Sequence, residues 1–555
     1  MGFMDNLENV FVFIGGLGLF LYGMHVMAEG LQKSAGGKLK NLMAFLTKNR
    51  FIAVVVGALI TAIIQSSSAT TVMVVGFVNA GMLSLTQAVG VIMGANIGTT
   101  ITAWIVSANE WMGVLKPEFF APVLVGIGAF VLLFSRSDNK KKIGEIFVGF
   151  GVLFIGLTFM SNGIKPYRES EIFVQAFAVL GKNPLLGILA GAVVTAVIQS
   201  SSASVGILQT LAANGVVNWG SAIFITLGQN IGTCVTALIS SAGAGKNAKR
   251  ASVIHLLFNI IGTAIVGVVM YVVFLVNRSW AGEEINSVQI SIFHTTFNVV
   301  VTLAMFPFAN GLVKLSQMIV RDNEVEAGEE KSAVAELVQR LDRRILANPA
   351  FAIETANREI KNMAVLAYEN IKSAVLCLKD NTTDNTKEIF EKEIIINEYE
   401  KLITPFLVEI DNTSLSEVQH EQIKNMFYII SDIERIADYA ENIAKLSLSK
   451  KKDNVEFSSK GVKDLELIES KTLELLEIMV ENYDMATFEI IKMADFIENE
   501  IDDLEEEIRE KHINRLSKGK CSIESGVIFL DTISYLERVS DHASGVIGYN
   551  STYSN

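Results

Sequence analysis

Two identical polar segments lie inside stretches of the chain that contain no charged residue. Gln65-Ser66-Ser67-Ser68 lies within residues 51–109, and Gln199-Ser200-Ser201-Ser202 lies within residues 183–245. Serine hydroxyls and carbonyls at a break in a helix can coordinate a hard cation such as sodium, and N–H groups at a helix N-terminus attract an anion. The segments therefore predict a site for a cation and an oxyanion. The alternative is that the serines only let helices pack closely.

The two polar segments belong to a longer repeat with an offset of 134 residues. A second match at the same offset pairs Gly94, Asn96, Ile97, Gly98, Thr99 and Thr102 with Gly228, Asn230, Ile231, Gly232, Thr233 and Thr236. Chance does not keep register over such a distance. Because the first copy contains three predicted crossings, an odd number, the second copy must enter the membrane upside down. The sequence therefore predicts the inverted repeats of a transporter.

The composition separates a membrane part from an acidic part. Of the 555 residues 50% are hydrophobic and 19% are charged, and the mean hydropathy is +0.40, which is too apolar for an ordinary soluble protein of this size. The formal net charge is -13, and the acidic residues crowd beyond Asp322. Two domains of different solvent preference follow.

Apolar runs between charged residues predict seven membrane crossings and two re-entrant hairpins. The crossings are residues 11–31, 85–107, 119–135, 143–162, 219–242, 253–276 and 288–313. Residues 51–82 and 184–215 contain Gln and runs of Ser and Gly in their middle, which is typical of helical hairpins that enter and leave on one side. Basic residues follow the first, third and fifth crossings, so we place these loops and the acidic part in the cytoplasm, with the spans in the inner (cytoplasmic) membrane.

A third polar pattern occurs in two later spans. His255-x-x-Phe258-Asn259 is repeated as His294-x-x-Phe297-Asn298. One interpretation makes the asparagines part of a cavity wall. The other is that these side chains connect helices by hydrogen bonds. We leave the histidines out of the predicted site.

The acidic part has the pattern of amphipathic helices. Apolar residues recur there at three- and four-residue spacing, and we expect about six helices in two similar halves. Glu434 and Asp438 correspond to Glu537 and Asp541, and each pair lies on one face of a helix. Carboxylate pairs can bind metal where several helices converge, although a single pair is routine on a solvated face.

The two Gln-Ser-Ser-Ser segments, each followed by Gly-x-Asn-Ile-Gly-Thr, resemble the type II sodium–phosphate cotransporter family in its bacterial form. The resemblance covers roughly residues 11–313. It implies that the two hairpins meet at the membrane centre and contact phosphate and sodium. The residues that it implies are Gln65, Ser66, Ser67, Ser68, Asn96, Thr99, Thr100, Gln199, Ser200, Ser201, Ser202, Asn230 and Thr233. Because Cys234 replaces Thr100 in the second copy, we do not expect two identical ion sites.

The repeated Glu-Arg-x-x-Asp of the acidic part resembles the PhoU family of phosphate-signalling proteins. That family carries metal on two three-helix bundles, which implies a divalent or iron-type metal here. The implied ligands are Glu434, Asp438, Glu498, Asp502, Glu537 and Asp541. Glu393 is followed by Asn397 where the family has a second acid, so the first bundle departs from the pattern.

We therefore predict an all-α fold, a polytopic membrane protein with inverted repeats and re-entrant helical hairpins plus a cytoplasmic PhoU-like helical bundle. Residues 1–320 are the expected transport domain, with repeats at about 11–135 and 143–276 and a final span at 288–313. Residues 321–340 are a linker and residues 341–555 are the PhoU-like domain.

The resemblance implies a sodium-coupled secondary transporter of inorganic phosphate with a regulatory domain. The alternatives are a membrane-anchored phosphate-signalling regulator and a sodium-coupled carrier of another oxyanion. Nucleotide-binding loops, nucleophile elbows and zinc-type cysteine spacing are missing from the sequence, so we predict no enzyme activity. The expected partners are phosphate, sodium, the lipid bilayer, a second copy of the chain and phosphate-signalling proteins, but no nucleic acid.

Overall fold

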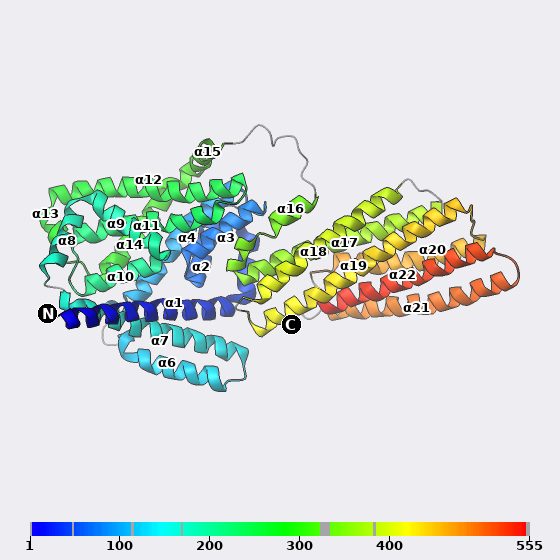
Figure 1. The fold of residues 1–555 in the computed structure, drawn as a ribbon, viewed down its shortest axis with the longest axis horizontal. Coiled ribbons are helices and arrows are strands. Elements are labelled where there is room, and N and C mark those ends of the chain that lie inside the picture. The colour runs from blue at the N-terminus through cyan, green and yellow to red at the C-terminus, as the bar shows by residue number, and fades with distance from the viewer. Residues whose placement is uncertain are drawn as a thin grey trace. The chain divides into compact units, whose positions relative to one another are not determined.

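The chain folds into helices that form two compact units (Figure 1). The structure is a computed structural model that describes residues 3–46, 49–112, 116–167, 170–321, 333–380, 385–413, 415–484 and 486–550. The first unit is Met1–Glu329 with Asp342–Phe351, and the second is Glu330–Leu341 with Ala352–Asn555. Most of the predicted linker, residues 322–332, lies outside the described residues. The described part contains no strand, so the predicted all-α class is confirmed.

The helices of the first unit are α1 (Phe3–Leu46), α2 (Arg50–Ile64), α3 (Ser67–Asn79), α4 (Leu85–Val106), α5 (Ala108–Trp111), α6 (Pro117–Phe134), α7 (Asp138–Ile164), η1 (Lys165–Tyr167), α8 (Glu171–Lys182), α9 (Pro184–Ile198), α10 (Ser201–Ala213), α11 (Trp219–Ser241), α12 (Lys246–Val276), α13 (Arg278–Gly282), α14 (Ser287–Met305), η2 (Phe306–Phe308), α15 (Ala309–Ile319) and η4 (Arg343–Ala347). The remaining helices are α16 (Ala333–Arg340), α17 (Pro349–Asp380), α18 (Thr386–Asp411), α19 (Glu417–Lys452), α20 (Ser459–Glu481), α21 (Phe488–Ser517) and α22 (Ile523–Asn550).

The predicted crossings correspond one to one to long apolar helices. Within the described residues, seven helices are long and apolar enough to cross a membrane: Leu7–Ala35, Leu85–Val106, Pro117–Phe134, Asp138–Tyr167, Trp219–Ser241, Lys246–Val276 and Ser287–Ile319. By contrast, α2 and α3 have only 15 and 13 residues, which is too short for a bilayer. The predicted seven spans agree with these seven candidates; the bent pair Gln175–Lys182 and Pro184–Ile198 would add an eighth if it counted as one span.

Each hairpin is broken at its glutamine in the same way. α2 ends at Gln65, which has the left-handed backbone values φ 57° and ψ 22°, and α9 ends at Gln199 with φ 57° and ψ 23°. The next residue then starts a new helix, because Ser66 Oγ accepts from Ala69 N and Ser200 Oγ accepts from Ala203 N. A positive φ is unusual for a residue other than glycine, so its occurrence at both glutamines marks a specific break.

Close backbone contacts hold the first arm of each hairpin. A Cβ added to Gly94 of α4 would overlap the carbonyl oxygen of Val54 in α2, and a Cβ added to Gly228 of α11 would overlap the carbonyl oxygen of Ile188 in α9. The glycines therefore let each broken helix lie directly against its neighbour, and both repeats use the same contact.

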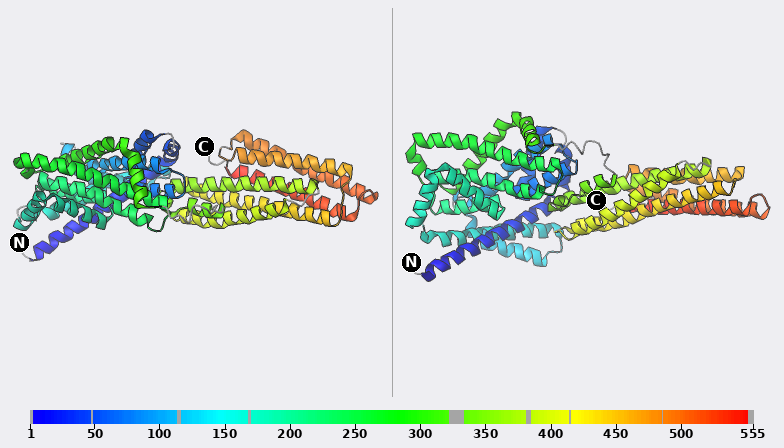
Figure 2. Two further views of the ribbon diagram at one scale, coloured as in Figure 1. Left: turned by 90° about the horizontal axis from the view of Figure 1, so that it is seen from above. Right: turned by 45° about the horizontal axis from the view of Figure 1, so that its top comes forward.

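α1 and α7 are the corresponding long helices of the two repeats and run antiparallel. Gly16 of α1 lies against Gly156, Gly23 lies against Gly149, and Gly30 lies against Ile146. Figures 1 and 2 show α1 alongside α7, with α6 packed on the other side of α7. An antiparallel pair is what inverted repeats require, so the predicted inversion agrees with the structure.

The second unit contains the expected six long helices, α17 to α22. α18 packs on α19, α20 and α21 each pack on α22, and α19 packs on α22 between the two halves. Buried isoleucines and leucines fill the interior, among them Ile433 and Leu536 beside the two repeated acidic motifs. The predicted helical bundle in two halves is confirmed.

We predict that Gly94→Ala and Gly228→Ala each destabilise the first unit, because the added methyl group would overlap a backbone carbonyl. Overpacking of this kind costs about 1–3 kcal/mol. The melting temperature of the purified protein should fall for both variants. Gly126→Ala is the matched control, since its added Cβ would meet no atom within 4 Å. Parent-like melting of the first two variants would contradict the contact.

Candidate functional site

The two hairpins meet at the serines that follow their breaks. Ser67 Oγ lies 3.4 Å from Ser201 Oγ, and both residues are in the first turn of their helices, α3 and α10. The packing is crossed, because α3 contacts α11 of the other repeat and α10 contacts α4. The N-terminal ends of two helices thus converge inside the unit. Such ends carry unpaired N–H groups and a partial positive charge, which suits an oxyanion.

The two glutamines have different surroundings despite their shared backbone geometry. The Gln65 side chain is buried, donates from Nε2 to Ala62 O and accepts at Oε1 from Thr102 Oγ1 at 3.0 Å. Gln199 is exposed, and in the part of the chain that the structure describes, the buried Thr236 Oγ1, which corresponds to Thr102, has no hydrogen-bond partner. Thr102 and Ala62 therefore engage both ends of the Gln65 amide.

The asparagines of the second matched segment are held by different partners. Asn96 Nδ2 donates to Asn259 Oδ1 at 3.2 Å, and Asn259 Nδ2 donates to Cys234 Sγ at 3.3 Å. Asn230 Nδ2 instead donates to Thr226 O at 3.0 Å within its own helix. In both asparagines the amide nitrogen is therefore engaged, which leaves the carbonyl oxygen as the freer end.

The predicted hydroxyl residues are mostly buried in the same region. Thr100 Oγ1 donates to Ile97 O and Thr233 Oγ1 donates to Gln229 O, so each keeps lone pairs for a ligand. The buried Thr99 Oγ1 has no partner among the described residues. Ser202 is buried, whereas Ser66, Ser68 and Ser200 are half-buried.

Asn259 is the member of the repeated His and Asn pattern that connects helices. Asn298 Nδ2 donates to His294 O at 2.9 Å, and Asn259 Nδ2 also donates to His255 O at 3.0 Å. Asn259 joins α12 to α4 and α11, which agrees with the hydrogen-bonding interpretation for this residue, whereas both bonds to the histidine carbonyls lie within a single helix. The same residue also touches the predicted site through Asn96.

Gln209 in α10 was not among the residues predicted from the sequence. Its Nε2 donates to Ala103 O, Ser287 O and Ser291 Oγ at 3.0, 3.1 and 2.8 Å, which ties the second hairpin to α4 and α14. The corresponding residue of the first copy is Val75, so the repeat gave no signal for it. The repeat did mark Thr102 as the counterpart of Thr236, but Thr102 was not among the predicted site residues.

Comparison with known proteins identifies the family of the first unit. The Na+/Pi-cotransporter family model matches residues 19–162 and 166–300, which contain both hairpins. This chain belongs to the Na+/Pi-cotransporter family. The PhoU domain model matches twice in the second unit, at residues 360–447 and 465–547. The chain is therefore a Na+/Pi-cotransporter family protein with a PhoU domain, as both resemblances implied.

Relatives of this Na+/Pi-cotransporter family chain include full-length and partial matches. YjbB of Escherichia coli O157:H7, whose name describes it as an inorganic phosphate export protein, is 23% identical over 95% of this chain and 94% of its own. The human sodium-dependent phosphate transport protein 2B is 32% identical over 20% of this chain and 16% of its own. The crystal structure of PhoU from Pseudomonas aeruginosa covers 36% of this chain and 95% of its own, with 17% identity and a TM-score of 0.34.

The PhoU domain brings three of the predicted metal ligands together. One carboxylate oxygen each from Glu498 and Asp502 of α21 and Asp541 of α22 lie within 4.8 Å of one another. Burial and then the charge of Asp502 raise the pKa of Glu498, while burial and then Asp541 raise the pKa of Asp502. Glu537, one turn before Asp541, has its pKa raised by burial and by Asp541. A hard cation bound to these oxygens would relieve their mutual repulsion.

The other predicted pair lies in a different acidic group. The pKa of Glu434 in α19 is raised by burial, by Asp438 and by Glu400 of α18. Asn397 Nδ2 donates to Glu393 Oε1 nearby, so the position where the family has an acid serves here as a hydrogen-bond donor. The six predicted ligands therefore do not form one site.

Gln65→Ala and Gln199→Ala should have different effects on the stability of the protein, although the two glutamines occupy equivalent positions in the repeat. Gln65→Ala removes the acceptor of a buried hydroxyl, Thr102 Oγ1, which costs about 1–3 kcal/mol, so its melting temperature should fall. Gln199→Ala should melt like the parent, because Gln199 is exposed. We expect both variants to lose phosphate transport. The same melting temperature for both would show that the Thr102 bond contributes nothing.

The acidic cluster should bind a divalent cation in a pH-dependent way. Its raised pKa values mean that the folded protein takes up protons more readily than the unfolded chain, so cation-free stability should increase as the pH falls toward about 5. Cation affinity should change in the opposite sense, because the ligands must be deprotonated.

Titration calorimetry with Mn²⁺ at about pH 7.5 and about pH 5 measures that affinity. Asp541→Asn should weaken binding at the higher pH. Glu507→Gln is the control on α21, the helix that carries Glu498 and Asp502, because Glu507 pairs with Lys511 outside the cluster. Equal Mn²⁺ affinity at both pH values, or for Asp541→Asn and the parent, would contradict the site.

Proposed function

We propose that this chain is a sodium-coupled carrier of inorganic phosphate in the cytoplasmic membrane, and not an enzyme. The observation that carries the proposal is the convergence of α3 and α10 at Ser67 and Ser201, whose Oγ atoms are 3.4 Å apart. Two helix N-termini directed at one point provide donors for the oxygens of phosphate from both repeats. A carrier needs such a site between halves that can move relative to each other.

Sodium coupling is supported by oxygen atoms on α4 and α11, the helices that pack against α3 and α10. The carbonyl ends of Asn96 and Asn230 and the hydroxyls of Thr99, Thr100 and Thr233 are neutral oxygen donors, which suit a hard cation. A bound cation beside the phosphate would offset part of its charge, so binding of one ion favours the other. The sodium in the name of protein 2B agrees with this reading.

Export is the second candidate for the direction of net flux. It is favoured by YjbB, which matches along nearly the whole of this chain and is named as an export protein. A coupled carrier is reversible, and the gradients of both ions decide its net direction. The same site therefore serves uptake under a sodium gradient and release of phosphate when the cellular phosphate gradient dominates.

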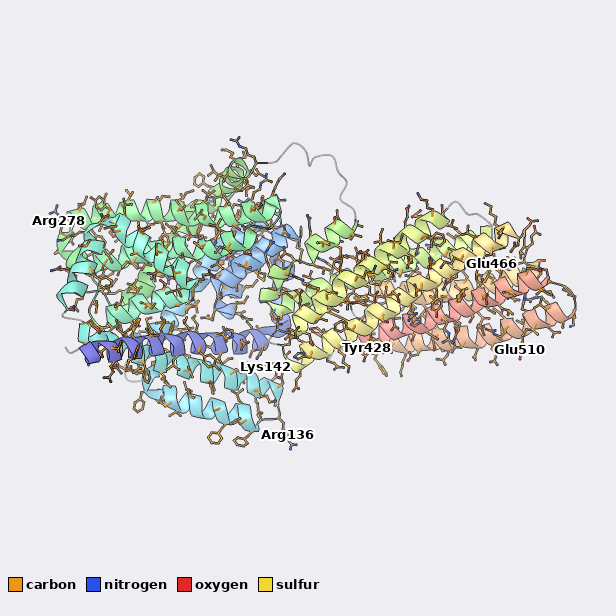
Figure 3. All side chains as sticks on the ribbon, viewed as in Figure 1. Arg136, Lys142, Arg278, Tyr428, Glu466 and Glu510 are labelled. Carbon is orange, nitrogen blue, oxygen red and sulfur yellow. The ribbon has the colours of Figure 1, made fainter. Side chains whose placement is uncertain are left out.

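The PhoU domain is proposed to lie in the cytoplasm and to regulate the carrier. Basic residues gather at one end of the first unit, where Gly245, just before Lys246, donates to Asn79 at the base of the first hairpin. Figure 3 places Arg136 and Lys142 at one end of this unit and Arg278 at the opposite end. The excess of basic residues marks the cytoplasmic end. A second copy of the chain and phosphate-signalling proteins are further proposed partners.

Proteoliposomes that contain the purified protein test the function directly. We expect labelled phosphate to accumulate when sodium is high outside, and preloaded phosphate to leave when the sodium gradient is reversed. Replacing sodium by potassium should abolish both fluxes. Fluxes that are equal in potassium would refute the coupling, and sulfate transport equal to phosphate transport would refute the substrate.

A further inference from the structure

The base of the first hairpin is covered by a segment from outside the repeats. Residues 342–351, here called the connector, belong to the first unit although the residues on both sides of them belong to the second. They comprise Asp342, η4 and the first turn of α17, and η4 packs against α3. The connector is thus the one described stretch that leads directly into the PhoU domain and contacts a hairpin.

Polar contacts fix the connector to the end of α3. Asn79 Nδ2, at the last residue of α3, donates to Asp342 Oδ2 at 2.8 Å. Asp342 Oδ1 accepts from Arg344 N at 2.9 Å and so caps η4. The Asn79 Oδ1 atom accepts from Gly245 N at 2.9 Å. One amide therefore joins the connector, the first hairpin and a loop of the second repeat.

Apolar contacts complete the attachment. Ile345 and Phe351 are almost completely buried, and the Phe351 ring meets the Phe77 ring edge to face with centroids 5.6 Å apart. A Cβ at Gly76 would lie 3.2 Å from Ile345 Cγ1 and 3.4 Å from Arg344 Cβ. Glycine at position 76 lets the connector approach the helix.

In the described part of the chain, the second hairpin lacks the residues of this attachment site. At the repeat offset Gly76 and Asn79 become Thr210 and Ala213, which offer neither the space nor the amide. The end of α10 is instead packed against residues of the first unit itself, including Val216, Val217 and Ile285. The differences between the repeats at these positions therefore coincide with the connector contact.

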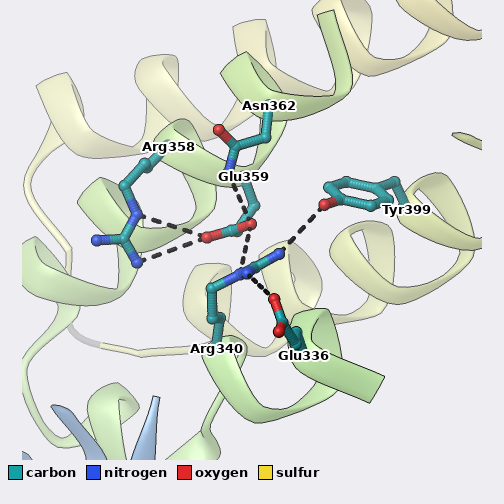
Figure 4. Close-up of polar contacts among 6 residues, drawn as sticks. All are labelled: Glu336, Arg340, Arg358, Glu359, Asn362 and Tyr399. Carbon is teal, nitrogen blue, oxygen red and sulfur yellow. Dashed lines mark hydrogen bonds and ion pairs between the residues drawn. The ribbon is translucent and has the colours of Figure 1, made fainter. Parts of the chain in front are cut away.

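The chain just before the connector is anchored to the PhoU domain. Figure 4 shows Arg340 of α16 bound to Glu359 of α17 and Tyr399 of α18, at 3.0 Å and 3.2 Å. Glu359 is completely buried and also accepts from Asn362 Nδ2. A buried, fully paired carboxylate makes this attachment costly to break. Arg340 precedes the ten-residue connector and Glu359 follows it. A movement of α16 and α17 would therefore act on both ends of the connector.

We propose that the end of α3 is the docking surface for the connector, and that through it the PhoU domain controls the first hairpin and not the second. This rests on the proposed function. α3 has 13 residues and is about 20 Å long, with the docking surface at one end and Ser67 at the other. Because a helix moves as a rigid rod, holding Asn79 restrains Ser67 at the site.

A disulfide between the two surfaces tests the docking. Arg344 Cβ and a Cβ at Gly76 are nearly at the distance of about 3.5–4.5 Å found in disulfides. The full-length Gly76→Cys/Arg344→Cys protein, with Cys521→Ser, should cross-link under mild oxidation in membranes. Gly76→Cys/Arg343→Cys is the matched control and should cross-link far less. Equal cross-linking of the two pairs, or none in the first, would overturn the docking.

The same cross-linked protein tests the control of one hairpin. Hydrogen exchange should be slower in α3 after oxidation and unchanged in α10, and sodium-driven phosphate flux should fall about five- to tenfold and recover on reduction, as is typical of allosteric coupling. Unchanged exchange in α3, or flux that does not depend on oxidation, would overturn the proposal. If the parent carries no phosphate, the proposed function fails, while the cross-link and the exchange still decide the docking and the restraint of α3.

Discussion

A helix that stops in the middle of a membrane leaves backbone groups that lipid cannot satisfy. The first unit contains two such stops, at Gln65 and Gln199, and much of its arrangement serves to cover them. Glycines on α4 and α11 let the first arm of each hairpin lie in backbone contact with a full-length span. Serines cap the second arms, so part of each break is satisfied locally. Under the proposed function, the backbone groups that are left over are those that a transported ion would use.

The two repeats share this backbone plan but not the side chains that surround it. Thr61 Oγ1 donates to Thr70 Oγ1 in the first copy, whereas in the second copy Ser204 accepts from Gln229, a residue that the first copy replaces by Ala95. Cys234 takes the place of Thr100 and contacts Asn259. The backbone arrangement is therefore the same in the two repeats, while the side chains around it differ from one repeat to the other. Two equivalent cation sites are not expected from such a frame.

The order of spans and hairpins could be predicted because hydropathy and the 134-residue repeat are both properties of the linear sequence. The end of α1 could not, since the helix continues past Lys33 to Leu46, beyond the apolar run that predicted a span of 11–31. A charged residue ends a membrane span but not a helix. The hydrogen bond from Thr102 to Gln65 could not be predicted either, because it depends on how α4 is rotated relative to the first hairpin. The carboxylate pairs were visible as i and i+4 spacing, yet only the packing of α21 on α22 decides that Glu498, Asp502 and Asp541 converge.

Among the residues that the structure describes, the Thr102 bond to Gln65 has no counterpart at Gln199, and this bears on the resting state of the protein. In an inverted-repeat carrier, the inward-facing and outward-facing forms arise when the two repeats exchange conformations. With identical repeats the two forms would have equal energy in the absence of ions. A single buried hydrogen bond contributes about 1 kcal/mol, which is enough to favour one form several-fold. Under the proposed function, a bond that forms in only one of the two conformations would give the empty carrier a preferred side of the membrane before any ion gradient acts on it.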